Sequence, residues 1–148
     1  MASHKSEFQQ IDILATEVFG KMLVIDGKVQ ACEMDEFVYH EMLTHPALLS
    51  HPNPRKVLVA GGGDGGTGRE CLKHSCVQEV TLVEIDRMVI ELCQTHMPGL
   101  ASRLSEDSRV RVAPDDASKI IQQARNMDVI LVDSSDPVGP SEALFQPE

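Results

Sequence analysis

A glycine-rich turn within residues 57–70, VLVAGGGDGGTGRE, constrains the fold more than any other stretch of the chain. Gly61, Gly63 and Gly66 form the pattern G-x-G-x-x-G directly after an apolar run and directly before a helical pattern. This order is typical of the nucleotide-binding edge of a parallel α/β sheet. Glu84 ends the next apolar run, where a carboxylate can accept hydrogen bonds from ribose hydroxyls. The turn therefore predicts a Rossmann-like domain that binds an adenosine-containing ligand.

Asp64, inside this turn, indicates which kind of nucleoside is bound. A dinucleotide would place a pyrophosphate against the turn and the start of the helix, and a carboxylate repels a phosphate. A sulfonium nucleoside instead places an aliphatic amine there, and a carboxylate pairs with an ammonium. Asp64 therefore favours a cationic nucleoside over NAD.

The rest of the chain after residue 52 alternates between apolar runs and helical patterns. Uniformly apolar strands joined by helices are typical of a parallel sheet with helices on both faces. Asp86 predicts the cap of the second helix, and Pro98 with Gly99 predicts its end. The predicted strands are 57–60, 80–83, 109–113 and 128–132, and the other predicted helices are 67–73 and 117–125.

The first third of the chain predicts a small unit of its own. Asp26-Gly27 between two extended runs is a strong hairpin signal. A helix follows, and Pro46 limits its length. The turn-rich segment Ser50–Arg55 marks a boundary, so we expect a β-hairpin and helix unit in residues 1–52 and a nucleoside-binding domain in residues 53–148. The predicted apolar face of the helix consists of Phe37, Val38, Met42 and Leu43.

The charge and cysteine content exclude several classes of function. A net charge of −10, from 23 acidic and 13 basic residues, argues against nucleic-acid binding and would steer a cationic ligand towards the protein. Four cysteines without C-x-x-C spacing predict reduced thiols rather than a zinc site. The sequence has no apolar run long enough for a membrane span and no apolar signal region at its start, so we expect a cytoplasmic protein with no membrane contact.

Acidic residues also follow the third and fourth predicted strands. Asp115 and Asp116 come where a side chain could accept a hydrogen bond from an adenine amino group. Asp133 and Asp136 belong to the segment VDSSDPVGP, and two carboxylates this close raise each other's pKa unless a cation lies between them. A polyamine ammonium would serve, and one carboxylate could then take a proton from an attacking amine. Without the other motifs, the same two residues could be a capping acid and a turn former.

Four stretches carry a resemblance together: LVIDGKVQACEMDEFVYHEML, HPNPRKVLVAGGGDGGTGRE, TLVEID and VILVDSSDPVGPSEALF. In this order and spacing they resemble the polyamine aminopropyltransferases of the spermidine synthase family. The resemblance implies a Rossmann-like fold of the S-adenosylmethionine-methyltransferase type, with strand order 3-2-1-4. It implies transfer of an aminopropyl group from decarboxylated S-adenosylmethionine, a co-substrate, to putrescine, with no metal and no bound prosthetic group. It further implies a homodimer or homotetramer of the full-length form, and because the family's domain continues past residue 148, we expect a fragment or a truncated product.

The resemblance also implies roles for individual residues. Asp133 matches the general base, Asp64 the residue that binds the aminopropyl amine, and Asp136 one that holds the far amine of putrescine. Glu84 matches the ribose ligand, and Ala117 stands where the family usually has glycine. The remaining nucleoside-side matches are Gln9, Gly61, Gly63, Asp115, Asp116, Ala117 and Pro140, and the remaining polyamine-side matches are Tyr39, His40, Ser134 and Ser135.

Two alternatives to this activity stay open at the level of sequence. A putrescine N-methyltransferase would use the same sheet with S-adenosylmethionine itself. Asp64 argues against it, because a carboxylate there would repel the carboxylate of the donor. The second alternative is a non-catalytic fragment that binds a polyamine or a nucleoside.

Overall fold

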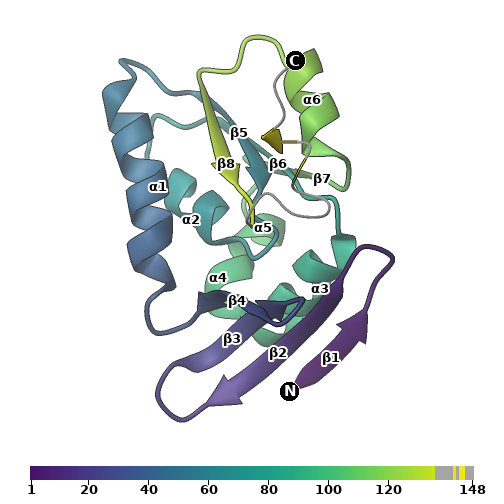
Figure 1. Cartoon of the computed structure of the whole chain (residues 1–148). Helices are drawn as coiled ribbons and strands as arrows, with labels where there is room; N and C mark the ends of the chain where they lie inside the picture. Colours follow the sequence, from purple (N-terminus) through teal and green to yellow (C-terminus); the bar gives the residue numbers. More distant parts are fainter. Residues whose placement is uncertain (136–141, 143, 146–148) are drawn as a thin grey trace.

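Two four-stranded sheets organise the chain, of which the computed structural model describes residues 1–135, 142, 144 and 145 (Figure 1). The N-terminal sheet is antiparallel, in the order β1-β2-β3-β4. Asp26 and Gly27 have φ values of 48° and 76°, the backbone that a two-residue hairpin turn requires, so the predicted hairpin is present. The sheet contains two strands that the sequence did not predict, and its members are β1 (Ala2–Lys5), β2 (Gln10–Thr16), β3 (Gly20–Ile25) and β4 (Lys28–Cys32).

The second sheet is parallel, and its strand order β7-β6-β5-β8 is the predicted 3-2-1-4. β5 pairs with β6 on one side and with β8 on the other, so its residues 57–60 are fully buried. The order along the sheet therefore reverses at β5. Open α/β sheets bind ligands at such a reversal, outside the carboxyl ends of the strands. The strands are β5 (Lys56–Gly61), β6 (Glu79–Val83), β7 (Val110–Ala113) and β8 (Val129–Asp133).

Helices cover both faces of the parallel sheet, which confirms the predicted fold class (Figure 1). On one face, α1 (Glu36–Ser50), α2 (Gly66–Leu72) and α5 (Arg103–Glu106) share an apolar core with the strands. On the other face, α6 (Ala117–Gln123) packs against β5 and β6. Among the described residues, none of the helices has both the length and the apolar character that crossing a bilayer requires.

A separate apolar cluster joins the two sheets through α3 (Arg87–His96) and α4 (Pro98–Ala101). Ile11 and Ile13 of the N-terminal sheet belong to the same cluster as residues of both helices. The Asp86 carboxylate accepts a hydrogen bond from the Met88 N–H at 3.0 Å, which confirms the predicted cap. Pro98 does not simply end the helical region but begins α4, a position that suits proline because its N–H would have no helical partner there. This packing holds the N-terminal sheet beside the carboxyl edge of the parallel sheet.

α1 differs from its predicted form in two ways. It continues through Pro46 to Ser50. Pro46 is exposed, so solvent can satisfy the carbonyl group that the missing N–H leaves free. The predicted apolar face is also wrong, because Phe37, Val38 and Met42 are 47%, 55% and 68% exposed. The buried side of α1 is mostly polar and consists of Glu36, His40, Thr44 and Leu48.

Candidate active site

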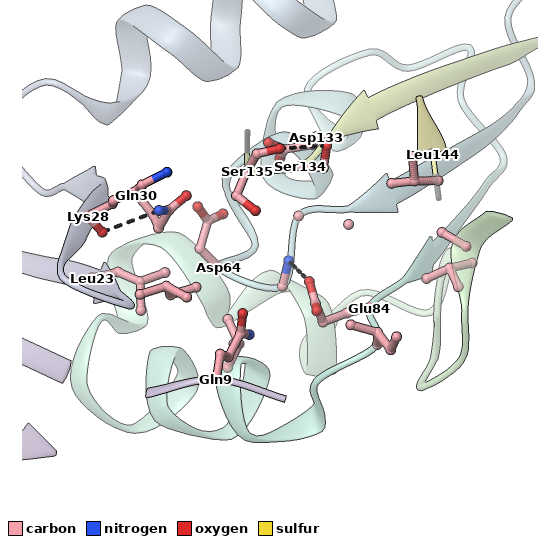
Figure 2. Close-up of a pocket in the computed structure, with 18 of the residues that line it drawn as sticks. Gln9, Leu23, Lys28, Gln30, Asp64, Glu84, Asp133, Ser134, Ser135 and Leu144 are labelled. Carbon is pink, nitrogen blue, oxygen red and sulfur yellow. Dashed lines mark hydrogen bonds between the residues drawn. The ribbon is translucent and has the colours of Figure 1, made fainter. Parts of the chain in front are cut away.

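A cavity of about 300 Å³ lies between the carboxyl edge of the parallel sheet and the N-terminal sheet (Figure 2). Asp115 borders a second, more open hollow instead, and His40 is not among the lining residues. Asp136 and Pro140 lie outside the described residues. The predicted site residues that line the cavity are Gln9, Tyr39, Gly61, Gly63, Asp64, Glu84, Asp116, Ala117, Asp133, Ser134 and Ser135.

The glycine turn brings the ends of β5, β6 and β8 into direct contact. Gly61 has a φ of +85°, and a Cβ there would clash with the carbonyl oxygen of Asp133. The Gly62 N–H donates to that same oxygen at 2.8 Å. A Cβ on Gly63 would lie 2.7 Å from Cγ of Glu84. Glycine at positions 61 and 63 therefore lets the turn lie against both acidic residues at once.

Glu84 is held at the end of β6 by two backbone donors. Its Oε2 accepts from the Gly63 N–H at 3.1 Å, and its Oε1 accepts from the Asp86 N–H at 3.0 Å. Burial, together with the charges of Asp86 and Asp133, raises the pKa of Glu84 to about 7 against the opposing effect of these two donors. Each carboxylate oxygen has a second lone pair, so the oriented carboxylate can also accept from two neighbouring hydroxyls, as on a ribose.

Asp86 ties the N-terminal sheet to this end of the cavity. Its Oδ2 accepts from the Gln9 amide at 3.1 Å and from the Ser6 hydroxyl at 2.6 Å. Gln9 lies just before β2 and lines the cavity close to Glu84 (Figure 2). The arrangement places a glutamine and a glutamate from two different sheets on one side of the same ligand space.

Asp115 and Asp116 have separate positions in the structure. Asp116 caps α6, because its Oδ1 accepts from the Ser118 N–H at 3.0 Å and from the Ser118 hydroxyl at 2.6 Å. It still lines the cavity, together with Ala117. The Asp115 carboxylate accepts from the Asp116 N–H at 2.7 Å. The structure thus brings Asp116, but not Asp115, to the cavity beside Glu84.

Asp133 receives one hydroxyl donor on each carboxylate oxygen. The Tyr39 hydroxyl donates to Oδ1 at 3.0 Å, and the Thr67 hydroxyl donates to Oδ2 at 2.6 Å. Burial and the charge of Asp64 raise the pKa of Asp133 to about 6, against the opposing effects of Thr67, His40 and Tyr39. Burial and the nearby Asp133 charge also raise the pKa of Tyr39. Asp133 is therefore an oriented carboxylate whose pKa is close to neutral pH, as a general base requires.

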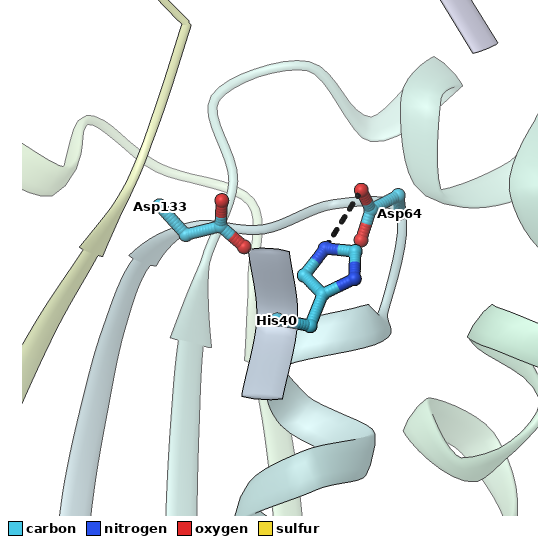
Figure 3. A group of neighbouring side chains, drawn as sticks. All are labelled: His40, Asp64 and Asp133. Carbon is cyan, nitrogen blue, oxygen red and sulfur yellow. Dashed lines mark ion pairs between the residues drawn. The ribbon is translucent and has the colours of Figure 1, made fainter. Parts of the chain in front are cut away.

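Asp64 is fixed in a similar way by residues of the same two helices. Its Oδ1 accepts from the Gly66 N–H at 2.8 Å, and its Oδ2 lies 3.4 Å from Nε2 of His40 (Figure 3). The side chain is 11% exposed. In α1, Tyr39 contacts Asp133 and its neighbour His40 contacts Asp64. In α2, Thr67 contacts Asp133 and its neighbour Gly66 contacts Asp64.

These carboxylates suit an amine better than a metal ion. Ligand atoms of His40, Asp64 and Asp133 lie within 4.8 Å of one another. However, His40 Nδ1 also lies 2.6 Å from Glu36 Oε2. A ring that donates from both nitrogens has no lone pair for a metal. A second group, Glu41, His45 and Glu70, has similar spacing, but there the Lys73 ammonium already lies 2.6 Å from the Glu70 carboxylate.

The sequence did not predict several residues that shape the site. Thr67 is fully buried against Asp133, but a threonine in the first turn of a helix carries no signal of such a role. The N-terminal sheet contributes an entire wall, which depends on the packing of α3 and could not be placed from local patterns. The unpredicted residues of this wall are Leu23, Ile25, Lys28, Val29 and Gln30.

Replacing Gly66 with alanine should lower the free energy of unfolding by about 1–3 kcal/mol, the usual cost of overpacking. The reason is that a Cβ at this position would clash with the imidazole ring of His40. Gly99→Ala is the matched control, because nothing lies within 4 Å of the added Cβ. Urea unfolding of both variants measures the difference, and equal stabilities would contradict the observed placement of His40 against α2.

Known proteins resemble this chain along nearly its whole length. Residues 36–148 match the spermine/spermidine synthase domain, and residues 3–33 match the spermidine synthase tetramerisation domain. A polyamine aminopropyltransferase of Shouchella clausii is 54% identical, covering 97% of this chain and 52% of the relative. Spermine synthase SPE4 of Saccharomyces cerevisiae is 49% identical, covering 96% of this chain and 49% of the relative. The chain spans about half the length of the curated relatives it matches.

Solved structures show the same likeness in three dimensions. A spermidine synthase in complex with the transition state analogue AdoDATO superposes with a TM-score of 0.96 at 39% identity, covering 99% of this chain and 50% of that one. The spermidine synthase from Thermotoga maritima superposes with a TM-score of 0.88 at 39% identity, covering 90% of this chain and 47% of that one. Sequence and fold therefore agree on the same group of relatives.

Proposed function

This chain belongs to the spermine/spermidine synthase family, and we propose that it transfers an aminopropyl group from decarboxylated S-adenosylmethionine to putrescine. The observation that carries the proposal is one cavity with two kinds of acidic site. Asp64 and Asp133 suit the amines of the two substrates, and Glu84 suits the ribose of the donor. The similarity to a spermidine synthase in complex with a transition state analogue supports the same reaction.

The proposed reaction needs one base and accurate positioning of two substrates. The amine nitrogen of putrescine forms a bond to the carbon next to the sulfonium, and the carbon–sulfur bond breaks with its electron pair going to sulfur. Methylthioadenosine leaves as a neutral thioether, and the attacking nitrogen gives one proton to Asp133, so the products are spermidine and methylthioadenosine. Because a sulfonium is a good leaving group, positioning and a single base can supply the catalysis.

The other predicted residues take roles that follow from their places around the cavity. Glu84 and Gln9 would hold the ribose side of the donor, with Asp116 and Ala117 on its adenine side. Asp64 would bind the aminopropyl ammonium. Around the acceptor amine we assign Tyr39, Ser134 and Ser135, which line the cavity with Asp133, and the predicted roles of His40, Asp115, Asp136 and Pro140 stay predictions.

We also propose a cytoplasmic homodimer or homotetramer that binds small amines and no nucleic acid. The match of residues 3–33 to a tetramerisation domain supports an oligomer. The N-terminal sheet and its turns expose large apolar side chains, among them Val18 and Phe19 at 68% and 45%, which self-association would bury. The predicted division after residue 52 stays a prediction.

Incubation of the protein with putrescine and decarboxylated S-adenosylmethionine tests the activity. Chromatography with mass detection should show spermidine and methylthioadenosine appearing in equal amounts. The same mixture with S-adenosylmethionine should yield neither an aminopropyl product nor N-methylputrescine. Donor binding without any spermidine, or formation of N-methylputrescine, would contradict the proposed function.

The pH dependence of kcat/KM should show an acid limb that involves two groups. Asp133 must be ionised to accept a proton, and Glu84 must be ionised to accept from the ribose hydroxyls. Since their pKa values are about 6 and about 7, kcat/KM should fall as the pH drops below neutrality and fall more steeply once both groups are protonated. A limb centred near pH 4, as for ordinary carboxyl groups, would contradict these assignments.

A further inference from the structure

A chain of buried and partly buried charged side chains continues from Asp64 away from the cavity, and the mechanism above uses none of its members except Asp64. His40 is 2% exposed, and its two ring nitrogens face two carboxylates. The Glu36 carboxylate in turn accepts hydrogen bonds from both terminal nitrogens of Arg69, at 2.8 and 2.9 Å. Alternating charges therefore run in the order Asp64, His40, Glu36 and Arg69, and we call these four residues the ion chain.

The geometry of the ion chain defines the protonation state of His40. The 2.6 Å contact of Nδ1 with Glu36 places a hydrogen on Nδ1, and the Asp64 carboxylate 3.4 Å from Nε2 favours a second hydrogen there, so the arrangement favours the imidazolium. Burial alone would lower the pKa of His40, but its hydrogen bonds with Asp64 and Glu36 raise it to about 10. Burial would likewise raise the pKa of Glu36, but the donors His40 and Arg69 lower it to about 2.

Stability is a poor explanation for this arrangement. Buried ion pairs often contribute little to folding, because the cost of removing the charges from water offsets their attraction. The ion chain also has a direction, since its inner end is anchored on α2 and its outer end is a carboxylate that lines the cavity. A buried arrangement that ends on a ligand-facing group is better explained by orientation of that group.

The charges around His40 match a single substrate ammonium. The groups that face the ring are Glu36 from α1 itself, Asp64 from the glycine turn and Asp133 from β8, with the Tyr39 ring edge-on at 5.2 Å. Arg69 balances Glu36, and Lys73 balances Glu70, which also contacts the Arg69 guanidinium. One net negative charge then remains on His40, Asp64 and Asp133 together, and one bound ammonium neutralises it. Without the imidazolium, two adjacent carboxylates would raise each other's pKa.

We propose that Glu36, His40 and Arg69 are positioning residues that act through Asp64, holding its carboxylate in place for the donor amine and keeping Asp133 ionised for its task as base. In this role His40, which does not line the cavity, orients Asp64 from behind, in place of the polyamine contact that the sequence predicted for it. The identity of the ligand rests on the proposed function, whereas the protonation of His40 and its dependence on Glu36 do not.

The protonation of His40 can be measured without an activity assay. In ¹⁵N NMR spectra, the His40 ring signal is identified by its absence from the His40→Gln protein. We expect wild-type His40 to remain an imidazolium at neutral pH, and its titration midpoint to fall by about 1–2 pH units in Glu36→Gln, because a hydrogen bond to a charged group is lost. Glu41→Gln is the matched control, since Glu41 follows His40 in sequence but contacts Lys73, and it should leave the midpoint unchanged.

Ligand binding and pH dependence then separate a positioning role from a merely structural one. In Glu36→Gln, the Kd of decarboxylated S-adenosylmethionine should rise about tenfold to a hundredfold, while the Kd of methylthioadenosine, which lacks the amine, should change less than about threefold. In His40→Gln, the acid limb of kcat/KM should move to higher pH, because the neutral side chain no longer lowers the pKa of Asp133. Equal losses for both ligands, or an unchanged His40 midpoint, would overturn the proposal.

Arg69→Lys provides a second variant if Glu36→Gln does not fold. Lysine keeps the charge but loses the two-pronged contact with Glu36, so the same changes are expected in the same direction and at smaller size. If the wild-type protein binds no donor, the proposed function is wrong. The NMR titration still decides whether the ion chain sets the state of His40.

Discussion

Replacing Asp133 with asparagine should lower kcat by about a hundredfold to ten-thousandfold, the usual contribution of a general base. Asparagine has nearly the same shape, and its carbonyl oxygen can still accept from one of the hydroxyls of Tyr39 and Thr67. It cannot accept a proton from the attacking amine. The Kd of methylthioadenosine should therefore stay within about threefold of its wild-type value, because the nucleoside side of the cavity is intact.

Single-turnover kinetics and calorimetry measure the two quantities for Asp133→Asn. Asp12→Asn is the control, because Asp12 lies on β2 away from the cavity and bonds to Ser3. Wild-type turnover in Asp133→Asn would contradict the assignment of the base. A destabilised fold would show as a lowered melting temperature. For this reason kcat is compared per folded molecule.

Replacing Asp64 with asparagine should weaken binding of the decarboxylated donor by roughly 2–5 kcal/mol, the range for removing one partner of a buried charge pair. This corresponds to a factor of about 30 to several thousand in Kd. The loss should be confined to ligands that carry the aminopropyl amine, so methylthioadenosine should bind almost as before. The physical reason is that Asp64 lines the cavity and is the carboxylate that we assign to that amine.

Asp35→Asn is the matched control for Asp64→Asn. Asp35 is exposed at the start of α1 and makes no capping hydrogen bond, and asparagine is an equally good residue at a helix N-terminus. Calorimetric titration of both variants with the donor and with methylthioadenosine gives four affinities. If Asp64→Asn weakened the two ligands equally, Asp64 would be a residue that maintains the turn and not the site of the amine.

The parallel sheet could be predicted from the sequence because its signals are local. Each strand is a short apolar run, and each run is followed by a helical pattern, so the strand order followed once the family resemblance was seen. The N-terminal sheet was predicted only in part. The alternation of Ile11 and Ile13 on β2 was a usable signal, since both residues are buried, whereas β1 is mostly exposed and carries no comparable pattern.

The error on α1 has a clear physical cause. Pattern analysis assumes that the apolar side of a helix is the buried one, but the buried side here contains Glu36 and His40. Apart from their contact with each other, those side chains are satisfied by Asp64 and Arg69, which come from a distant part of the sequence. Local sequence cannot show that a polar side will find such partners, and functional sites are where this rule is expected to fail.

The residues of the candidate site also form two groups, those that the sequence could predict and those that it could not. The acidic residues at strand ends could be found because the ends of parallel strands meet at one edge of the sheet. Their partners could not be found, because Thr67, Glu36 and Arg69 occupy helix positions without a distinctive sequence pattern. Only tertiary contacts bring them to the site. The structure also distinguishes two adjacent acids that the sequence treated alike, because Asp116 lines the cavity and the second hollow whereas Asp115 lines only the second hollow.

The central claim is that the glycine turn accepts an amine-bearing sulfonium nucleoside that lacks a carboxylate. Calorimetric titration of the wild-type protein with decarboxylated S-adenosylmethionine and with S-adenosylmethionine tests it most directly. Because a carboxylate of the ligand would lie near Asp64, we expect the decarboxylated donor to bind at least about tenfold more tightly, equal to about 1.4 kcal/mol. Equal binding of the two nucleosides, or tighter binding of S-adenosylmethionine, would contradict the account.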